Sequence, residues 1–186
     1  LFFEAKEAGA KMITVDPHYS TTASKSDEWI PIEPGTDAAL YFGMIVHIVE
    51  QGLIDQDFMK QHTSYPFLVD VATGKLIREH EPQMVVDEEG NEAPEDGQAD
   101  PFYVIDEATG AVVPYRQTTN PSLSGTVEFR GATVRTVYDL LLDSLANYSV
   151  DWASEITGIP AEKIKELAEL YAEGPSSLAL GWGGND

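Results

Sequence analysis

Two short apolar runs near the N-terminus each end in a loop that carries an acidic residue, and this arrangement constrains the fold most. The first run (residues 12–15) ends at Asp16, and the second (29–32) leads into a turn that ends at Asp37. Apolar runs of this length are typical of buried parallel strands. In an open α/β sheet, ligands bind beyond the carboxyl ends of the strands, where an acidic residue commonly accepts ribose hydroxyls. The two strand ends therefore predict a nucleotide site.

The segments around these runs predict the helices of a doubly wound sheet. Residues 1–8 have the pattern of a helix end that precedes the first strand. Residues 38–51 are apolar on almost every side, which predicts a buried helix with Leu40, Met44 and Val49 in the core. The fragment contains no G-x-G-x-x-G sequence, so the usual pyrophosphate-binding turn is not predicted.

Two roles are open for Asp37. It can N-cap the helix that starts at Ala38, because Asp is among the preferred capping residues. Its carboxylate can instead accept paired N–H bonds from a guanine edge, which is a charge-assisted bidentate contact. An ionised carboxylate at a helix N-terminus is favoured in either case.

The charge balance excludes some classes of partner. The 186 residues include 32 acidic and 11 basic side chains, for a net charge of −21. This disfavours nucleic acid, because phosphate contacts need clustered Lys and Arg. No apolar run approaches the ~18 residues of a membrane span, so no direct membrane insertion is predicted. The chain has no Cys, begins without Met and ends just after a glycine-rich turn, which suggests a piece of a longer protein.

The middle of the chain, residues 64–133, predicts β-hairpins. Two segments share an Asp-x-Ala-Thr-Gly turn between apolar residues, and a third turn is expected at Arg130-Gly131. Between the first two, residues 79–100 are strongly acidic and predict a solvated, mobile loop. Calcium binding by residues 87–91 is a weaker alternative, because the spacing does not match an EF-hand.

The C-terminal third predicts helices and one more strand. Apolar residues at helical spacing indicate three helices, and their apolar stripes are read as core. The first covers residues 134–145, the second contains Trp152, Ala153 and Ile156 and ends before Gly158, and the third begins at Pro160 and stops at Gly174-Pro175. Residues 177–180 predict a short strand, followed by a glycine-rich turn at 181–185. A shorter helix is expected over 53–63, with Asp55 as its N-cap and Phe58 and Met59 facing inward.

Patterns for other chemistries are absent from the sequence. The four His residues show no metal-ligand spacing, and His47 is read as a hydrogen-bonded core residue. No G-x-S-x-G or Ser/His/Asp arrangement is present. We therefore predict no catalytic residues and no metal ligands in this chain.

Two separated motifs resemble one known family. The sequence Met-Ile-Thr-Val-Asp-Pro-His-Tyr-Ser (12–20) and the sequence Trp-Ile-Pro-Ile-Glu-Pro-Gly-Thr-Asp (29–37) are similar, in order and spacing, to the dinucleotide-binding domain of the dimethyl sulfoxide reductase family of molybdopterin oxidoreductases. The resemblance implies that Asp16 contacts ribose and Asp37 contacts guanine. Two positions depart from it: Glu33 and His18 stand where that family often has Arg. The other implied cofactor-binding residues are Pro17, His18, Tyr19, Ser20, Gly35, Thr36, Gly181, Trp182 and Gly184.

The fold class expected on this basis is α/β, a three-layer sandwich with a mostly parallel, Rossmann-like sheet and an all-β hairpin insert. Residues 1–63 would form the first part of the dinucleotide-binding domain, 64–133 the insert with its acidic loop, and 134–186 the remainder of the α/β domain.

The resemblance also implies the function of the whole enzyme. The cofactor would be molybdenum with bis(molybdopterin guanine dinucleotide), with a 4Fe-4S cluster outside this chain, and the reaction would be reduction of an S-oxide, N-oxide or related small molecule in anaerobic respiration. The chain alone is predicted to be inactive. Implied partners are the rest of its own catalytic polypeptide, a membrane anchor and an iron–sulfur protein for electron transfer, with export by a twin-arginine signal. Two alternatives stay open: a binding module for another nucleotide, and an acidic extracellular interaction domain.

Overall fold

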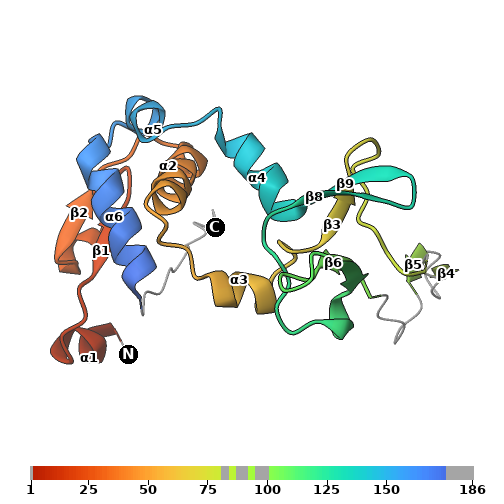
Figure 1. The fold of residues 1–186 in the computed structure, drawn as a ribbon. Coiled ribbons are helices and arrows are strands. Elements are labelled where there is room, and N and C mark those ends of the chain that lie inside the picture. The colour runs from red at the N-terminus through yellow and green to blue at the C-terminus, as the bar shows by residue number, and fades with distance from the viewer. Residues whose placement is uncertain (1, 81–83, 87–91, 95–100, 175–186) are drawn as a thin grey trace. The chain divides into compact units, whose positions relative to one another are not determined.

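The computed structural model describes residues 2–80, 84–86, 92–94 and 101–174 (Figure 1). The chain divides into two compact units, one formed by Leu1–Ile54 with Leu145–Asp186 and the other by Asp55–Ser144. The predicted limits of functional domains at residues 63 and 133 stay predictions, because a division by compactness does not define functional domains.

The first unit contains the predicted pair of parallel strands. β1 (Ile13–Val15) pairs with β2 (Glu28–Ile30) in parallel, with Ile13 opposite Glu28 and Val15 opposite Ile30. The mixture of helices with a small parallel sheet agrees with the expected α/β class, and the three-layer arrangement stays a prediction. The helical elements of this unit are α1 (Phe2–Glu7), the 3-10 turn η1 (Ala23–Lys25), α2 (Asp37–Glu50), α5 (Val150–Thr157) and α6 (Ala161–Glu173).

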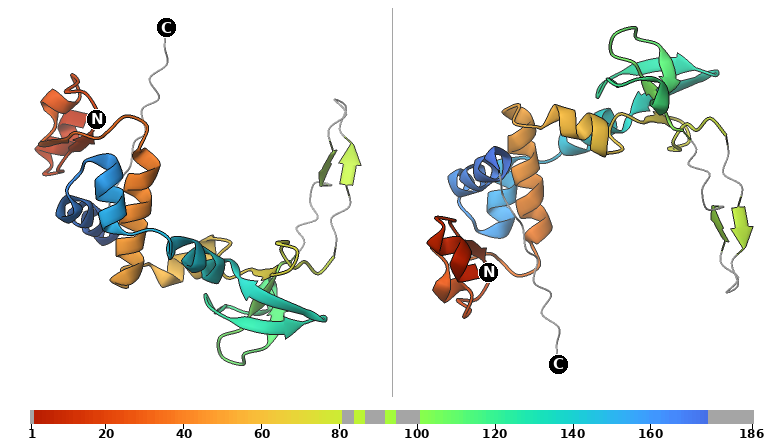
Figure 2. Two further views of the ribbon diagram at one scale, coloured as in Figure 1. Left: turned by 90° about the horizontal axis from the view of Figure 1, so that it is seen from above. Right: turned by 90° about the horizontal axis from the view of Figure 1, so that it is seen from below.

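Helices α2, α5 and α6 pack together, as the orange and blue helices show in Figures 1 and 2. Gly158 ends α5 with a left-handed φ of 72°, and Pro160 immediately precedes α6. Both are the stop and start signals expected from the sequence. The apolar core that joins these helices to the strand pair contains Ile30, Ile32, Leu40, Val150, Ala153, Ile159 and Ile164.

The prediction that α2 is buried on every side is wrong for this chain. Leu40 is buried, but Met44 and Val49 are only partly buried, and Ile45 is 38% exposed. Helices α5 and α6 pack against α2 and cover part of its circumference. Some apolar side chains of α2 are therefore not buried by the described residues.

The described residues of the second unit form antiparallel strands and the helices α3 and α4. The three-stranded sheet has the order β3-β9-β8, and two further ladders pair β4 with β5 and β6 with β7. Leu68, Tyr103, Ile105 and Val134 form its core. This agrees with the predicted hairpin composition. The elements are α3 (Gln56–His62), β3 (Leu68–Asp70), β4 (Met84–Val86), β5 (Glu92–Pro94), β6 (Tyr103–Ile105), β7 (Val112–Pro114), the 3-10 turn η2 (Tyr115–Gln117), β8 (Thr126–Phe129), β9 (Ala132–Thr136) and α4 (Val137–Leu145).

The hairpin turns form as their sequences predict. In the β6–β7 turn, Asp106 accepts hydrogen bonds from the backbone N–H and hydroxyl of Thr109, and Gly110 takes a φ of 69°. The turn between β8 and β9 has positive φ at both Arg130 (54°) and Gly131 (81°), as a two-residue type I′ hairpin requires. Val134, which the helical pattern included, lies instead in β9.

Helix α3 has the predicted N-cap, and Met59 is partly buried as expected, but Phe58 points outward. The Asp55 carboxylate accepts the backbone N–H of Phe58 at 2.9 Å, so the predicted cap is confirmed. Phe58 is nevertheless 55% exposed, and Lys60 is buried with its ammonium bonded to Glu107 (2.5 Å) and Asn120 (3.0 Å). Residues two apart on an α-helix lie on nearly opposite sides, so burial of Lys60 turns Phe58 outward.

Part of the acidic segment is ordered into strands. β4 pairs with β5 in an antiparallel ladder that joins Met84 to Pro94 and Val86 to Glu92, so residues 84–86 and 92–94 are strands and not loop. The partial mobility expected for the segment stays a prediction. The apolar run Met84-Val85-Val86 has high β-propensity, which the acidic composition of the segment obscured. The calcium alternative at 87–91 and the predicted strand at 177–180 lie outside the described residues.

Candidate functional site

The carboxyl ends of β1 and β2 lie together at one edge of the strand pair. Because the two strands are parallel and in register, Val15 and Ile30 are opposite each other, and the chain leaves both strands on the same side. The backbone N–H of Asp16 donates to the carbonyl of Ile30 at 3.2 Å, which extends the ladder by one residue. Asp16 is thereby held directly beside the exit of β2, as the sequence predicts.

The loop after β1 is organised by the side chain of Asp16. Its Oδ1 accepts the backbone N–H of His18 at 2.9 Å, which is the local bond that Asp forms in turns. This hydrogen bond, with a further one from the Ser20 side chain, holds the pKa of Asp16 below its ordinary value. The carboxylate is therefore ionised at neutral pH and able to accept hydrogen bonds from hydroxyl groups.

Ser20 and Tyr19 continue this loop. The Ser20 hydroxyl accepts the backbone N–H of Ala23 at 3.3 Å, where η1 begins. Tyr19 is 64% exposed, and its ring makes a T-shaped contact with Trp29, with centroids 5.3 Å apart and an interplanar angle of 78°. The loop that carries Asp16 thus also presents an aromatic ring to solvent.

Trp29 on β2 is a residue of this site that the sequence analysis did not single out. Its indole N–H donates to the carbonyl oxygen of Asp16 at 2.9 Å, across the strand pair. The available signal was chemical: a Trp in a short half-buried strand needs a partner for its N–H. The pattern of apolar residues alone does not say which carbonyl that partner is.

The turn after β2 is fixed at both ends. The backbone N–H of Glu33 donates to the Thr157 carbonyl at 3.0 Å, at the end of α5. The Glu33 carbonyl in turn accepts both the backbone N–H (3.3 Å) and the hydroxyl (2.7 Å) of Thr36. Pro34 and Gly35 occupy the two central positions, and Gly35 has a φ of 77°, which is the requirement of a type II turn.

Gly35 also leaves room for a ligand. A Cβ built on it meets no atom of the described residues within 4 Å, so these residues leave that side of the backbone open. The residue is needed here for its positive φ, and its missing side chain exposes the peptide backbone at the strand end.

The capping role proposed for Asp37 is wrong. The helix begins at Asp37 itself, and Thr36 occupies the N-cap position without a side-chain capping bond. The Thr36 hydroxyl is already bonded to the Glu33 carbonyl, so the turn geometry moves the helix start by one residue. Asp37 is exposed, and no hydrogen bond or ion pair joins its carboxylate to another residue of the described segments.

The remaining predicted site residues fall into two groups. Pro17 and His18 are exposed in the Asp16 loop. Gly181, Trp182 and Gly184 lie outside the described residues. The segments 16–22 and 31–37 contain no Lys or Arg, so the two loops offer acceptors for a nucleoside and little positive charge for a pyrophosphate.

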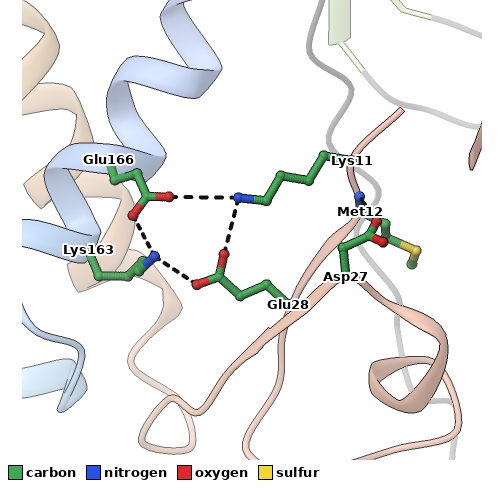
Figure 3. A network of polar contacts seen from close by, with 6 residues as sticks. All are labelled: Lys11, Met12, Asp27, Glu28, Lys163 and Glu166. Carbon is green, nitrogen blue, oxygen red and sulfur yellow. Dashed lines mark hydrogen bonds and ion pairs between the residues drawn. The ribbon is translucent and has the colours of Figure 1, made fainter. Parts of the chain in front are cut away.

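A ring of four charged side chains fastens the strand pair to α6 (Figure 3). Lys163 lies 2.7 Å from Glu28 and 2.5 Å from Glu166, and Lys11 lies 3.3 Å from Glu28 and 3.8 Å from Glu166. The hydrogen bond from Lys163 is the main cause that lowers the pKa of Glu28. Beside this ring, Asp27 accepts the backbone N–H of Met12 at 2.8 Å. These contacts fix the amino ends of the strands whose carboxyl ends form the candidate site.

The buried histidine is accounted for structurally. His47 is 6% exposed and its Nε2 lies 3.0 Å from Glu169 on α6, which confirms the interpretation as a hydrogen-bonded core residue.

Among the described residues, no three His, Asp or Glu side chains are grouped so as to hold a metal ion. None of the helices in the described segments has the length and apolar character needed to cross a membrane.

The parallel strand pair and the helices packed on it define the class of this unit as α/β. The family follows from sequence comparison. The profile of the molybdopterin oxidoreductase family matches residues 1–184. The chain therefore belongs to the molybdopterin oxidoreductase family, as its two motifs predict.

Similar proteins cover nearly the whole chain. The alpha subunit of dimethylsulfide dehydrogenase from Rhodovulum sulfidophilum is 30% identical over 190 residues, which are 96% of this chain and 20% of that protein. The catalytic subunit of a putative dimethyl sulfoxide reductase from Halobacterium salinarum is 33% identical over 184 residues, which are 97% of this chain and 20% of that protein. The chain thus spans about a fifth of the length of these relatives.

A solved structure supports the fold alone. Acetylene hydratase from Pelobacter acetylenicus matches with a TM-score of 0.52 and 21% sequence identity, over 96% of this chain and 15% of that one. The fold of the chain is therefore similar to part of a larger known protein.

Proposed function

We propose that this chain is the part of a molybdopterin-dependent oxidoreductase that binds the guanosine end of a molybdopterin guanine dinucleotide. The observation that carries the proposal is the pair of parallel strand ends, which places Asp16 beside the exit of β2. Asp16 accepts ribose hydroxyls and Asp37 accepts the N–H groups of guanine. The family membership supports the cofactor, and the strand ends supply the acceptors that a guanosine needs.

The residues of the site fit a nucleoside. The Asp16 carboxylate is kept ionised by its own loop, the Asp37 carboxylate is exposed, and Gly35 leaves open space beside the backbone. Tyr19 adds an exposed aromatic ring. Pro17, His18, Ser20 and Thr36 shape the two loops and complete the described part of the site, with Gly181, Trp182 and Gly184 as further proposed contacts.

The proposed cofactor of the whole enzyme is molybdenum with bis(molybdopterin guanine dinucleotide), with a 4Fe-4S cluster held by cysteines elsewhere, since this chain has none. Relatives are named for dimethyl sulfide, dimethyl sulfoxide and nitrate, and several are named as alpha subunits. We propose that the whole enzyme reduces an S-oxide, N-oxide or related small molecule. We also propose that it is exported, associates with a membrane anchor and receives electrons from a separate iron–sulfur protein. The chain alone provides the binding of one cofactor end and is not expected to turn over.

The test replaces Asp37 by Asn in the full-length enzyme. Asn loses one acceptor oxygen and turns an NH₂ group toward the guanine donors, which costs on the order of 1–3 kcal/mol. We expect molybdenum and guanine nucleotide content of the purified enzyme to fall by about tenfold, as measured by metal analysis and by nucleotide release.

A matched control separates recognition from helix stability. Asp37→Asn also removes a charge from the first turn of α2, which is worth about 0.3–1 kcal/mol. Asp151→Asn removes the same kind of charge from the first turn of α5, and Asp151 lines a surface hollow with Glu50 and Gln51 at the opposite end of α2. The control should keep its cofactor. Unchanged cofactor content in Asp37→Asn would remove guanine recognition from the proposal.

A further inference from the structure

We infer that Trp29 is a positioning residue, which aims the Asp16 carboxylate at the ribose by holding the backbone of Asp16. This inference rests on the proposed function, because it concerns how the same site selects a ribonucleoside. It goes beyond that function by assigning selectivity for the sugar to a residue on the neighbouring strand.

Both backbone polar groups of Asp16 are hydrogen-bonded to residues of β2. Its N–H donates to the carbonyl of Ile30 at 3.2 Å, and its carbonyl accepts the indole N–H of Trp29 at 2.9 Å. With both groups engaged by neighbouring residues of one strand, the peptide planes on either side of Asp16 are fixed. The direction of the Cα–Cβ bond is then fixed as well.

The side chain of Asp16 is also held by a hydrogen bond. Its Oδ1 accepts the N–H of His18 at 2.9 Å, so the carboxylate is held within the loop that follows. Trp29 also packs against the exposed ring of Tyr19, with centroids 5.3 Å apart. One indole therefore supports both the ionised acceptor and the aromatic ring of the Asp16 loop.

The contact of Trp29 is directional. The indole has a single donor, and without it the Asp16 carbonyl loses its partner in a part-buried position. A small rotation of that peptide displaces the carboxylate, and hydrogen bonds weaken steeply once their angle falls well below the preferred range. Loss of the Trp29 N–H should therefore weaken the hydrogen bonds between Asp16 and the sugar. The turn before Asp37 should stay unchanged, because it is held by contacts among Glu33, Thr36 and Thr157.

The experiment measures two affinity ratios in the full-length protein, purified free of cofactor from a host that does not make molybdopterin. The ratio of affinities for GDP and 2′-deoxy-GDP reports the ribose contact. The ratio for GDP and IDP, which lacks the guanine amino group, reports the base contact. For the unmodified protein we expect both ratios to be about tenfold, the effect of one charge-assisted hydrogen bond.

Trp29→Phe keeps an aromatic ring and removes the donor. We expect the ribose ratio to fall to about twofold while the base ratio stays near tenfold. Trp152→Phe is the matched control: Trp152, in α5, packs on the ring of Tyr148, and both ratios should be unchanged. A general loosening of the unit would lower both ratios together, and that result, like an unchanged ribose ratio, would overturn the inference.

A second replacement guards against a folding defect in Trp29→Phe. Benzothienylalanine in place of Trp29 keeps the size and shape of the indole and exchanges only the N–H for sulfur. It should give the same selective loss of the ribose ratio. If the unmodified protein itself fails to prefer GDP over both analogues, the proposed function is overturned; if it does prefer GDP and the variant keeps the ribose ratio, only the role of Trp29 is overturned.

Discussion

At the scale of single residues, carboxylates in this chain serve different purposes according to what surrounds them. Asp16 is engaged by its own loop, and Asp37 is exposed at a helix start. Glu28 carries no candidate ligand contact but is bonded to Lys163 and Lys11, and its side chain is 26% exposed. The role of each acidic side chain thus follows from its partners and not from its residue type.

Glu28 gives a prediction about pH. Its pKa lies below the ordinary value, mainly because Lys163 bonds its ionised form. A depressed pKa contributes stability that is present above the unfolded pKa and is lost as pH falls through the folded pKa. Glu28→Gln should therefore lower the free energy of unfolding by about 0.5–1 kcal/mol at pH 7.

The measurement is urea unfolding followed by circular dichroism at pH 7 and at pH 3. The difference between Glu28→Gln and the unmodified chain should shrink as pH falls below the ordinary Glu range near 4.5. Glu7→Gln, on the exposed end of α1, serves as the control and should change neither value. A difference that is the same at both pH values would contradict an ionic origin.

At the scale of elements, the packing of α2 on α5 and α6 depends on a glycine within a helix. A Cβ on Gly43 would lie 2.6 Å from the Cβ of Ala153 and 3.3 Å from the Cγ2 of Ile164. Ala153 and Ile164 are fully buried, so neither can move toward solvent. Gly43 therefore sets the close approach of the three helices that support the turn before Asp37.

Gly43→Ala should destabilise the chain despite the better helix propensity of Ala. The propensity gain is about 1 kcal/mol, whereas a contact that must be relieved in a packed core costs typically 1–3 kcal/mol. We expect a net loss of up to about 2 kcal/mol in the free energy of unfolding, measured by urea denaturation.

The compensating change provides the control. Ala153→Gly removes the Cβ that Gly43→Ala would meet, so the double variant should be more stable than the sum of the two single effects. Residues in contact show interaction energies of about 0.5–3 kcal/mol in such cycles. Strict additivity would mean that the helices separate freely, and the argument from close packing would fail.

At the scale of the whole molecule, the charge of −21 is the dominant feature. Many of its basic side chains are already paired: Lys6, Lys11, Lys60, Lys163, Lys165 and Arg135 all form ion pairs. The carboxylates that outnumber the basic side chains therefore repel one another, and this repulsion destabilises the compact state.

Salt should consequently stabilise this chain. The screening length falls from about 10 Å at 0.1 M to about 3 Å at 1 M, which weakens repulsion between exposed carboxylates. We expect the midpoint of thermal unfolding to rise between 0.1 and 1 M NaCl, and KCl to give a similar rise. A midpoint that falls with salt would show that the ion pairs outweigh the repulsion.

The sequence by itself determined the elements whose signals are local. The helix ends at Asp55, Gly158 and Pro160, and the hairpin turns at Gly110 and Gly131, follow from residues that bond or bend their own backbone. The order of two strand ends, each followed by an acidic residue, was likewise readable, because apolar runs and turn residues lie next to one another in the chain. Family membership followed from the same two motifs.

The tertiary structure alone decided which side chains meet across the fold. It placed the Trp29 indole on the Asp16 carbonyl, joined Glu28 to Lys163, buried Lys60 in place of Phe58 and left Ile45 of α2 exposed. It also moved the start of α2 to Asp37, because the Thr36 hydroxyl bonds Glu33. Such contacts join residues far apart in sequence or depend on competing local bonds, and neither leaves a periodic pattern in the chain.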